Sequence, residues 1–316
     1  MSLVATLISN PAAPALDSAA IERARGALPA AQAPVWLDPG IAADIPFTGD
    51  TTNTQAHATQ AHVTQAHVTR ALADRVRAAL AGAQIDVVVH RAGPRRKALF
   101  LADMDSTMIG QECIDELADY VGLKPHVAAI TERAMRGEIE FAPALRERVA
   151  LLAGLPASVV DEVIADRISL TPGARTLVAT LRRNGAHTCL VSGGFTLFTG
   201  RIAAMIGFDE NRANTLLLDA GQRLTGQVAE PIVGSESKLA TLIELRQRYG
   251  VAPEATLATG DGANDIAMIE AAGLGVAYHA KPKVAEAAAA RIDHGDLTAL
   301  LYVQGYRRDE FVEAGE

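Results

Sequence analysis

Four short apolar segments alternate with helical segments over residues 98–277, and this alternation constrains the fold more than any other feature of the chain. It is typical of a parallel sheet that helices cover on both faces, because two parallel strands need a long crossover between them. Helices are expected at Ala174 to Arg183 and at Lys238 to Tyr249. The expected strands are Ala98 to Ala102, His187 to Val191, Thr256 to Thr259 and Leu274 to Ala277. The sequence therefore predicts an α/β fold.

The segment between the first two expected strands is too long for a simple crossover helix. It reads as mainly helical, with helices expected at Gln111 to Val121, Ala142 to Leu152 and Ser158 to Ile168. We therefore expect a helical cap at about residues 112–170, inserted into a domain that runs from 95 to 316.

Residues 1–94 read differently, as a small α+β unit. The strand-like segments are Leu3 to Ile8, Pro34 to Leu37 and Ile85 to His90. One helix is expected after Asp17, a good capping residue, and another over Arg70 to Gly82. Residues 91–97 combine a Gly-Pro turn with four basic side chains, which favours a linker.

Residues 54–69 repeat the motif Thr-Gln-Ala-His-Ala/Val with a period of five. On a helix, five residues turn through about 500°, so His57, His62 and His67 would not share a face. Metal sites prefer spacings of three or four. The repeat is therefore predicted to be a low-complexity linker at about 51–69, with metal binding as the alternative.

Two carboxylates follow the first strand of the predicted sheet. Asp103 and Asp105 point to the same side in extended backbone, where both stay ionised only if a cation joins them. Asp103 can attack phosphorus as a nucleophile, and Asp105 can act as general acid and base. An isolated Asp-x-Asp pair can equally be a solvated turn.

A hydroxyl and two glycines end the second strand. Ser192 and Gly193, followed by a further glycine, can cradle a phosphate with backbone N–H groups, although Ser-Gly-Gly alone is often a plain turn. Lys238, near the start of a helix, can neutralise that phosphate. Most lysines at such positions are only solvated.

The third strand is followed by Gly-Asp-Gly-Ala-Asn-Asp. Asp261, Asn264 and Asp265 supply the clustered oxygen ligands that Mg²⁺ prefers, and a helix-capping loop is the alternative. These motifs all stand at strand or helix ends and in a fixed order. Together they predict phosphoryl transfer at the carboxyl edge of the sheet.

Composition excludes several other classes of protein. The net charge of −8 argues against a nucleic-acid partner, and no apolar run is long enough to span a bilayer. We see no signal peptide, and two cysteines, Cys113 and Cys189, are too few for a disulfide framework. A cytoplasmic protein is expected.

Over residues 95–303 the chain resembles the phosphoserine phosphatases of the haloacid dehalogenase superfamily. The resemblance lies in DMDST at 103–107, VSGGF at 191–195, Lys238 and GDGANDIAMI at 260–269. Intervening segments match too, namely QECIDEL at 111–117, MRG at 135–137, Phe141 and LRERV at 145–149.

The resemblance implies a metal site and a phosphate site. Mg²⁺ would be held by the carboxylates of Asp103 and Asp261 and the backbone carbonyl of Asp105, with Asp265 supporting it from behind. The remaining phosphate-binding residues would be Ser192, Gly193, Lys238 and Asn264.

The resemblance also implies a site for the amino-acid part of phosphoserine. Glu112 would pair with the ammonium and Arg148 with the carboxylate, under an apolar lid of Met135 and Phe141. Residues 1–94 would be ACT-like, with a possible homodimer. Read locally, Glu112 is a helix-start glutamate and Arg148 a solvated helix residue.

The expected reaction is hydrolysis of O-phospho-L-serine, the last step of serine biosynthesis. Three alternatives stay open at this point. The same residues could transfer the phosphate to homoserine, or could hydrolyse another small phosphate ester. The third alternative is a non-catalytic amino-acid sensor, which would need none of these catalytic residues.

Overall fold

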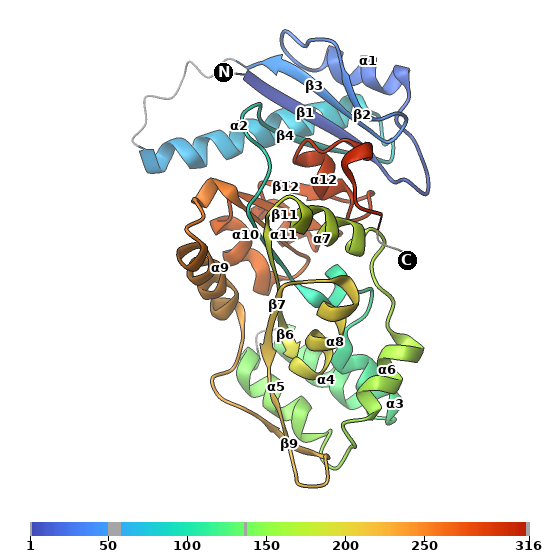
Figure 1. Ribbon diagram of the computed structural model, residues 1–316, viewed down its shortest axis with the longest axis vertical. Helices are drawn as coiled ribbons and strands as arrows, with labels where there is room; N and C mark the ends of the chain where they lie inside the picture. Colours follow the sequence, from blue (N-terminus) through green and yellow to red (C-terminus); the bar gives the residue numbers. More distant parts are fainter. Residues whose placement is uncertain (1, 50–57, 136–137, 314–316) are drawn as a thin grey trace.

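The structure is a computed structural model that describes residues 2–49, 58–135 and 138–313. Side chains are described within these ranges except at 58–67 and 134–135. A four-stranded sheet lies at one end of the molecule, a six-stranded sheet in the middle and a group of cap helices at the other end (Figure 1).

The central sheet has six parallel strands in the order β12-β11-β10-β5-β6-β7. The four predicted strands are β5 (Leu99–Ala102), β6 (His187–Phe195), β10 (Thr256–Gly260) and β11 (Leu274–Tyr278). This confirms the α/β fold. Two edge strands were not predicted, β7 (Glu210–Asn214) and β12 (Ala290–Ile292), because one is polar and the other has three residues.

Both faces of this sheet are buried. In β5, Leu99 and Leu101 pack toward α9 (Ser235–Tyr249) and α10 (Ile266–Ala271), while Phe100 and Ala102 pack into the core on the other face. That second core includes α7 (Ala174–Arg183), α8 (Thr196–Ile206) and α12 (Ala299–Val303). The short helix α11 (Pro282–Ala287) follows β11. The alternation of side chains along β5 explains why the strand is apolar throughout.

Four helices separate β5 from β6 and form the cap: α3 (Cys113–Tyr120), α4 (Lys124–Met135), α5 (Phe141–Ala150) and α6 (Val159–Arg167). Helix α3 therefore begins at Cys113, two residues after the predicted start at Gln111. A hairpin that was not predicted, β8 (Leu216–Leu218) and β9 (Leu224–Val228), joins the cap. The Gly154 N–H donates to the Leu224 carbonyl and the Leu224 N–H to the Leu155 carbonyl, both at 2.8 Å.

The N-terminal unit contains β1 (Ser2–Ser9), α1 (Ser18–Gly26), β2 (Val35–Asp38), β3 (Ala42–Thr48), α2 (Ala58–Ala79) and β4 (Ile85–Arg91). Its antiparallel sheet has the order β2-β3-β1-β4. Asp17 caps α1 by accepting from the Ala20 N–H at 2.7 Å. The predicted order lacked β3, where Pro46 argues against a central strand even though it pairs with Val4 of β1.

The prediction of a linker across the Thr-Gln-Ala-His repeat was wrong from Ala58 onward. Helix α2 begins there, twelve residues before the predicted start at Arg70, and includes His62 and His67. Alanine and glutamine are good helix formers, and the repeat lacks glycine and proline, so composition alone is misleading. His57 lies outside the described residues, as do the side chains of His62 and His67.

Several hydrogen bonds join the N-terminal unit to the rest of the chain. The Asp86 carboxylate, on β4, accepts from the backbone N–H groups of Asp293 and Gly295, each at 2.7 Å. Tyr302 donates its hydroxyl to Asp38 at 2.6 Å. We call the Asp86 contact with residues 293–295 the Asp86 clasp.

Among the described residues, no helix is long and apolar enough to cross a membrane.

Candidate active site

The predicted motifs converge at the carboxyl edge of the central sheet. Asp103 follows β5, Ser192 lies in β6 and Asp261 follows β10, and β5 lies between the other two strands. The Asp103 N–H donates to the Thr259 carbonyl of β10 at 3.0 Å, which fixes the start of the Asp103 turn. The order of the strands thus gathers residues that are far apart in the sequence.

Lys238 contacts Asp103 directly. Its side chain is completely buried, and Nζ lies 2.7 Å from Asp103 Oδ1 and 2.7 Å from Asp265 Oδ1. Burial favours the neutral amine, but the two carboxylates outweigh this effect and raise the pKa of Lys238. The ammonium is therefore held between two anions and directed at the edge of the sheet.

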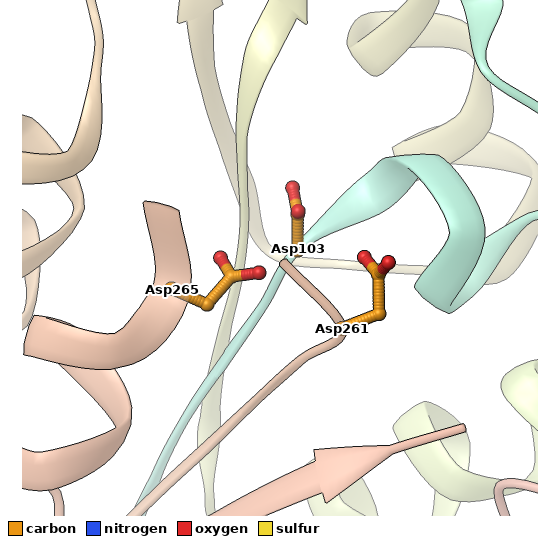
Figure 2. A group of neighbouring side chains, drawn as sticks. All are labelled: Asp103, Asp261 and Asp265. Atoms are coloured by element: carbon orange, nitrogen blue, oxygen red, sulfur yellow. The ribbon is translucent and has the colours of Figure 1, made fainter. Parts of the chain in front are cut away.

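Asp103, Asp261 and Asp265 form a buried acidic group in which one oxygen of each carboxylate lies within 4.8 Å of the other two. Figure 2 shows the three carboxylates reaching a common space from separate parts of the backbone. Burial raises the pKa of Asp103 well above its usual range, despite the nearby ammonium, and also raises that of Asp261. Such a set of oxygen donors fits a hard divalent cation, which would favour their ionised form.

Asp265 differs from the other two carboxylates because both of its oxygens already have partners. Oδ1 accepts from Lys238 at 2.7 Å, and Oδ2 accepts from the Gly262 N–H at 3.1 Å. A side chain on Gly260 would meet the Asp265 carboxyl carbon at 2.3 Å, so only glycine fits there. This arrangement favours Asp103 and Asp261 as the direct ligands, with Asp265 behind them.

Asp105 is oriented by two hydrogen bonds. Its Oδ1 accepts from the Cys113 N–H at 2.9 Å, and its Oδ2 accepts from the Ser192 hydroxyl at 3.2 Å. Burial raises the pKa of Asp105, which favours the protonated acid. The next residue, Ser106, has a left-handed backbone (φ +54°) and donates its hydroxyl to Glu112 at 2.9 Å.

Asn214, a buried residue of β7 that sequence reasoning missed, joins the two segments that are predicted to bind phosphate. Its amide nitrogen donates to the carbonyls of Gly193 at 2.8 Å and Val233 at 3.0 Å. Its oxygen accepts from the Val233 N–H at 2.7 Å. Val233 lies two residues before α9, which carries Lys238, so one side chain sets the spacing between the Gly193 loop and that helix.

A cavity of about 490 Å³ opens above these residues and is walled by the cap. Glu112, Phe141 and Arg148 line it, as do Ser192, Gly193 and Asn264. Arg148 donates to the Ala144 carbonyl at 3.3 Å and to the Thr131 hydroxyl at 3.4 Å. The predicted pair from the cap therefore faces the same cavity as Asp103.

Glu112 lies near a second carboxyl group, and Phe141 packs against two glycines. Burial and the nearby Asp105 raise the pKa of Glu112 to about 7. The Phe141 ring lies so close to the backbone that a Cβ at either Gly193 or Gly234 would approach it to 3.3 Å. The side chain of Met135, at the end of α4, lies outside the described residues.

Three further polar residues of the lining were not predicted as site residues: Asp115, Thr131 and Lys281. Asp115 lies near Arg148 and opposes the effect of burial, which lowers the pKa of that guanidinium. Lys281 Nζ lies 3.9 Å from Asp261 Oδ2. Asp115 lies within the QECIDEL segment at 111–117 but was given no role, and Thr131 and Lys281 lie outside every motif that was quoted.

Comparison with known proteins agrees with this geometry. The family model for haloacid dehalogenase-like hydrolases matches residues 100–270. A phosphoserine phosphatase from Streptomyces coelicolor is 47% identical over 75% of this chain, and one from a Polaromonas species is 46% identical over 68%. The unliganded crystal structure of a Vibrio cholerae protein, described as a probable phosphoserine phosphatase, superposes with a TM-score of 0.74 at 31% identity.

The extent of these matches differs. The chain spans 57% of the Streptomyces protein but 94% of the Polaromonas protein. The match to the Vibrio structure covers 98% of this chain and 88% of that one. The chain thus belongs to the haloacid dehalogenase-like hydrolases and, within them, to the family of the phosphoserine phosphatases.

Proposed function

We propose that this protein hydrolyses O-phospho-L-serine to L-serine and phosphate through an aspartyl-phosphate on Asp103, with Mg²⁺ as cofactor. The observation that carries the proposal is one cavity with two chemically distinct walls. Asp103 and Asp261 lie at its base, beside Lys238, and Glu112 and Arg148 lie on the cap. The names of the relatives support phosphoserine as the substrate.

Asp103 is the proposed nucleophile. Its Oδ1 contacts Lys238 and accepts from the Met104 N–H at 2.8 Å, so we assign the attack to Oδ2. The new bond joins Oδ2 to phosphorus while the bond from phosphorus to the serine oxygen breaks. Lys238, Ser192, Gly193 and Asn264 would stabilise the charge on the phosphate oxygens.

Asp105 is the proposed general acid and base. In the first step its carboxyl group gives a proton to the departing serine oxygen. In the second step the resulting carboxylate takes a proton from a water molecule, which attacks phosphorus and releases Asp103 and inorganic phosphate. The hydrogen bonds from Cys113 and Ser192 hold Asp105 in one orientation for both transfers.

Mg²⁺ would be held by the carboxylates of Asp103 and Asp261 and the backbone carbonyl of Asp105, with Asp265 behind. When bound, it would neutralise negative charge on the phosphate and on the nucleophile. Asp265 fits its supporting position because its hydrogen bonds to Lys238 and Gly262 use both oxygens.

Glu112 and Arg148 are proposed to select the amino acid. Glu112 would pair with the substrate ammonium, and Arg148 would bind the carboxylate through its planar guanidinium. Phe141 and Met135 would close over the substrate and exclude water from the first transfer. The ACT-like character of residues 1–94, the division at residue 95 and a homodimer remain predictions, as do the cytoplasmic location and a place in serine biosynthesis.

A phosphate-release screen over small phosphate esters, with and without Mg²⁺, tests the proposal. We expect phosphoserine to be the best substrate, and Glu112→Gln and Arg148→Ala to lower kcat/KM for phosphoserine far more than for p-nitrophenyl phosphate. Equal losses on both substrates would contradict the assigned roles. Adding homoserine and analysing the products would detect phosphotransfer instead of hydrolysis.

Asp103→Asn tests the mechanism separately. The change keeps the size of the side chain but removes the anionic nucleophile, so we expect a loss of at least ~10³-fold in single-turnover rate. Asp309→Asn, at an exposed position away from the cavity, is the control. Full activity in the Asp103 variant would rule out the aspartyl-phosphate.

A further inference from the structure

Acidic residues outnumber cationic residues among the described side chains that line the cavity. Five acidic residues line it, and two cationic residues oppose them, Arg148 and Lys281; the acidic ones are Asp103, Asp105, Glu112, Asp115 and Asp261. The substrate of the proposed function is itself an anion with a phosphate of about −1.5 to −2. A cation that faces solvent would favour its approach.

Neither of the other two cations near the site meets this need. Lys238 is completely buried, does not line the cavity and is paired with two carboxylates. Arg148 is held on the cap by the Ala144 carbonyl and the Thr131 hydroxyl, on the wall assigned to the amino-acid group. The phosphate thus has no solvent-facing partner in either of them.

Lys281 has the required position. Its side chain is 60% exposed, and Nζ lies 3.9 Å from Asp261 Oδ2. The backbone beneath it is fixed, because the Lys281 N–H donates to the Asp261 carbonyl at 3.1 Å and Pro282 begins α11. The Lys281 backbone is therefore fixed beside the acidic base of the cavity, while its exposed side chain extends into solvent.

We propose that Lys281 is a substrate-binding residue that recruits the phosphate group at the mouth of the cavity. This proposal rests on the proposed function for the identity of the substrate, but it concerns the phosphate, which any ester hydrolysed here must carry. A cation in this position attracts the dianion and opposes its repulsion by the acidic lining. It acts on association and on KM, whereas Asp103 and Asp105 act on the chemical step.

The chain offers a matched control two residues away. Lys283 carries the same charge in the first turn of α11, is exposed and does not line the cavity. The comparison of Lys281→Met with Lys283→Met therefore separates a local contact from the general charge of α11.

The experiment measures kcat and KM for phosphoserine and for p-nitrophenyl phosphate at saturating Mg²⁺, in low and high KCl. We expect Lys281→Met to lower kcat/KM about tenfold on both substrates at low salt, with kcat almost unchanged and with a weaker dependence on salt. Calorimetric titration with inorganic phosphate in Mg²⁺ should show a similar loss of affinity. Lys283→Met should match the wild type in both measurements.

Two outcomes would overturn the proposal. Lys281→Met could match Lys283→Met in kcat/KM and phosphate affinity, which would leave Lys281 as a neutralising partner of Asp261 only. It could instead lower kcat with no change in salt dependence, which would place it in the chemical step. Failure of the proposed function would show separately, as a wild-type enzyme that prefers another ester.

Discussion

Glu112 shows at the scale of one residue how binding and stability oppose each other. Burial and Asp105 raise its pKa to about 7, so the carboxyl group is costly to ionise in the folded protein. The proposed role nevertheless requires the ionised form, because it pairs with a substrate ammonium. We therefore expect kcat/KM for phosphoserine to fall as the pH drops below about 7, and Glu112→Gln to lack this dependence.

Stability should respond in the opposite direction. Because its pKa is higher in the folded state, Glu112 binds more protons there, and the free energy of unfolding falls as the pH rises from about 4.5 to 7. Without metal, Glu112→Gln should be more stable than the wild type at pH 8 by about 1–2 kcal/mol, allowing for partial exposure, and equal to it at pH 4. Thermal unfolding in chelator measures this, with the exposed Glu270→Gln as control.

Asn214 permits a test of positioning without contact to the substrate. Asn214→Asp replaces the amide donor with an oxygen that faces the carbonyls of Gly193 and Val233, so the two phosphate-binding segments should separate. We expect the affinity for inorganic phosphate to fall about tenfold or more. In the control, Asn211→Asp on the same strand, the carboxylate can still accept from Thr199. Unchanged phosphate binding in both variants would contradict this role.

At the scale of elements, the hairpin β8–β9 completes the cap through close packing. Gly226 has φ +79°, and a Cβ there would lie 2.9 Å from the Ala153 Cβ. Gly226→Ala should therefore lower the free energy of unfolding more than Gly185→Ala, at a glycine with a similar φ of +82° but open space around it. We expect a difference of about 1–3 kcal/mol, measured by chemical denaturation. Equal losses would mean that backbone strain alone is responsible.

Elements with a strong local pattern could be predicted from the sequence. The strands β5, β6, β10 and β11 each contain a short apolar run, and the chemical motifs stand at the ends of three of these runs. The fold and the acidic base of the cavity could therefore be derived together. The polar strand β7 and the proline-containing β3 could not be predicted, because each is a strand only through pairing with a partner distant in the sequence. Asn214 and Lys281 gain their positions only from tertiary structure, because a lone asparagine or lysine has no distinctive spacing.

At the scale of the whole molecule, the Asp86 clasp adds hydrogen bonds to an apolar core that the two sheets share, because Ile8 and Val88 pack in the same core as Phe100. Asp86 is buried, and three consecutive N–H groups at 293–295 converge on it. The clasped loop leads back toward the cavity, because the His279 ring contacts the Gly295 carbonyl at 2.8 Å and Lys281 lies two residues further on. The N-terminal unit is thus connected to the rim of the cavity.

Asp86→Ala should loosen this connection. The loss of the carboxylate leaves buried N–H groups without their acceptor, so we expect the free energy of unfolding to fall by about 2–3 kcal/mol. Hydrogen exchange should increase at residues 279–295, and the exposed ion-pair variant Asp74→Ala is the control. Unchanged exchange in that segment would show that the clasp holds the units together without ordering the rim.

The order of strands in the central sheet has a consequence for synthesis on the ribosome. β5, which leads directly to Asp103, is the first strand of its sheet to be made, yet it lies between β6 and β10. One of its edges stays unpaired until residues 256–260 have been added, and Asp261 arrives only afterwards. Nascent chains therefore expose an apolar edge that chaperones can recognise. The same delay leaves Asp103 without the Asp261 carboxylate until β10 has been made, so the buried acidic group forms only after this later segment has emerged.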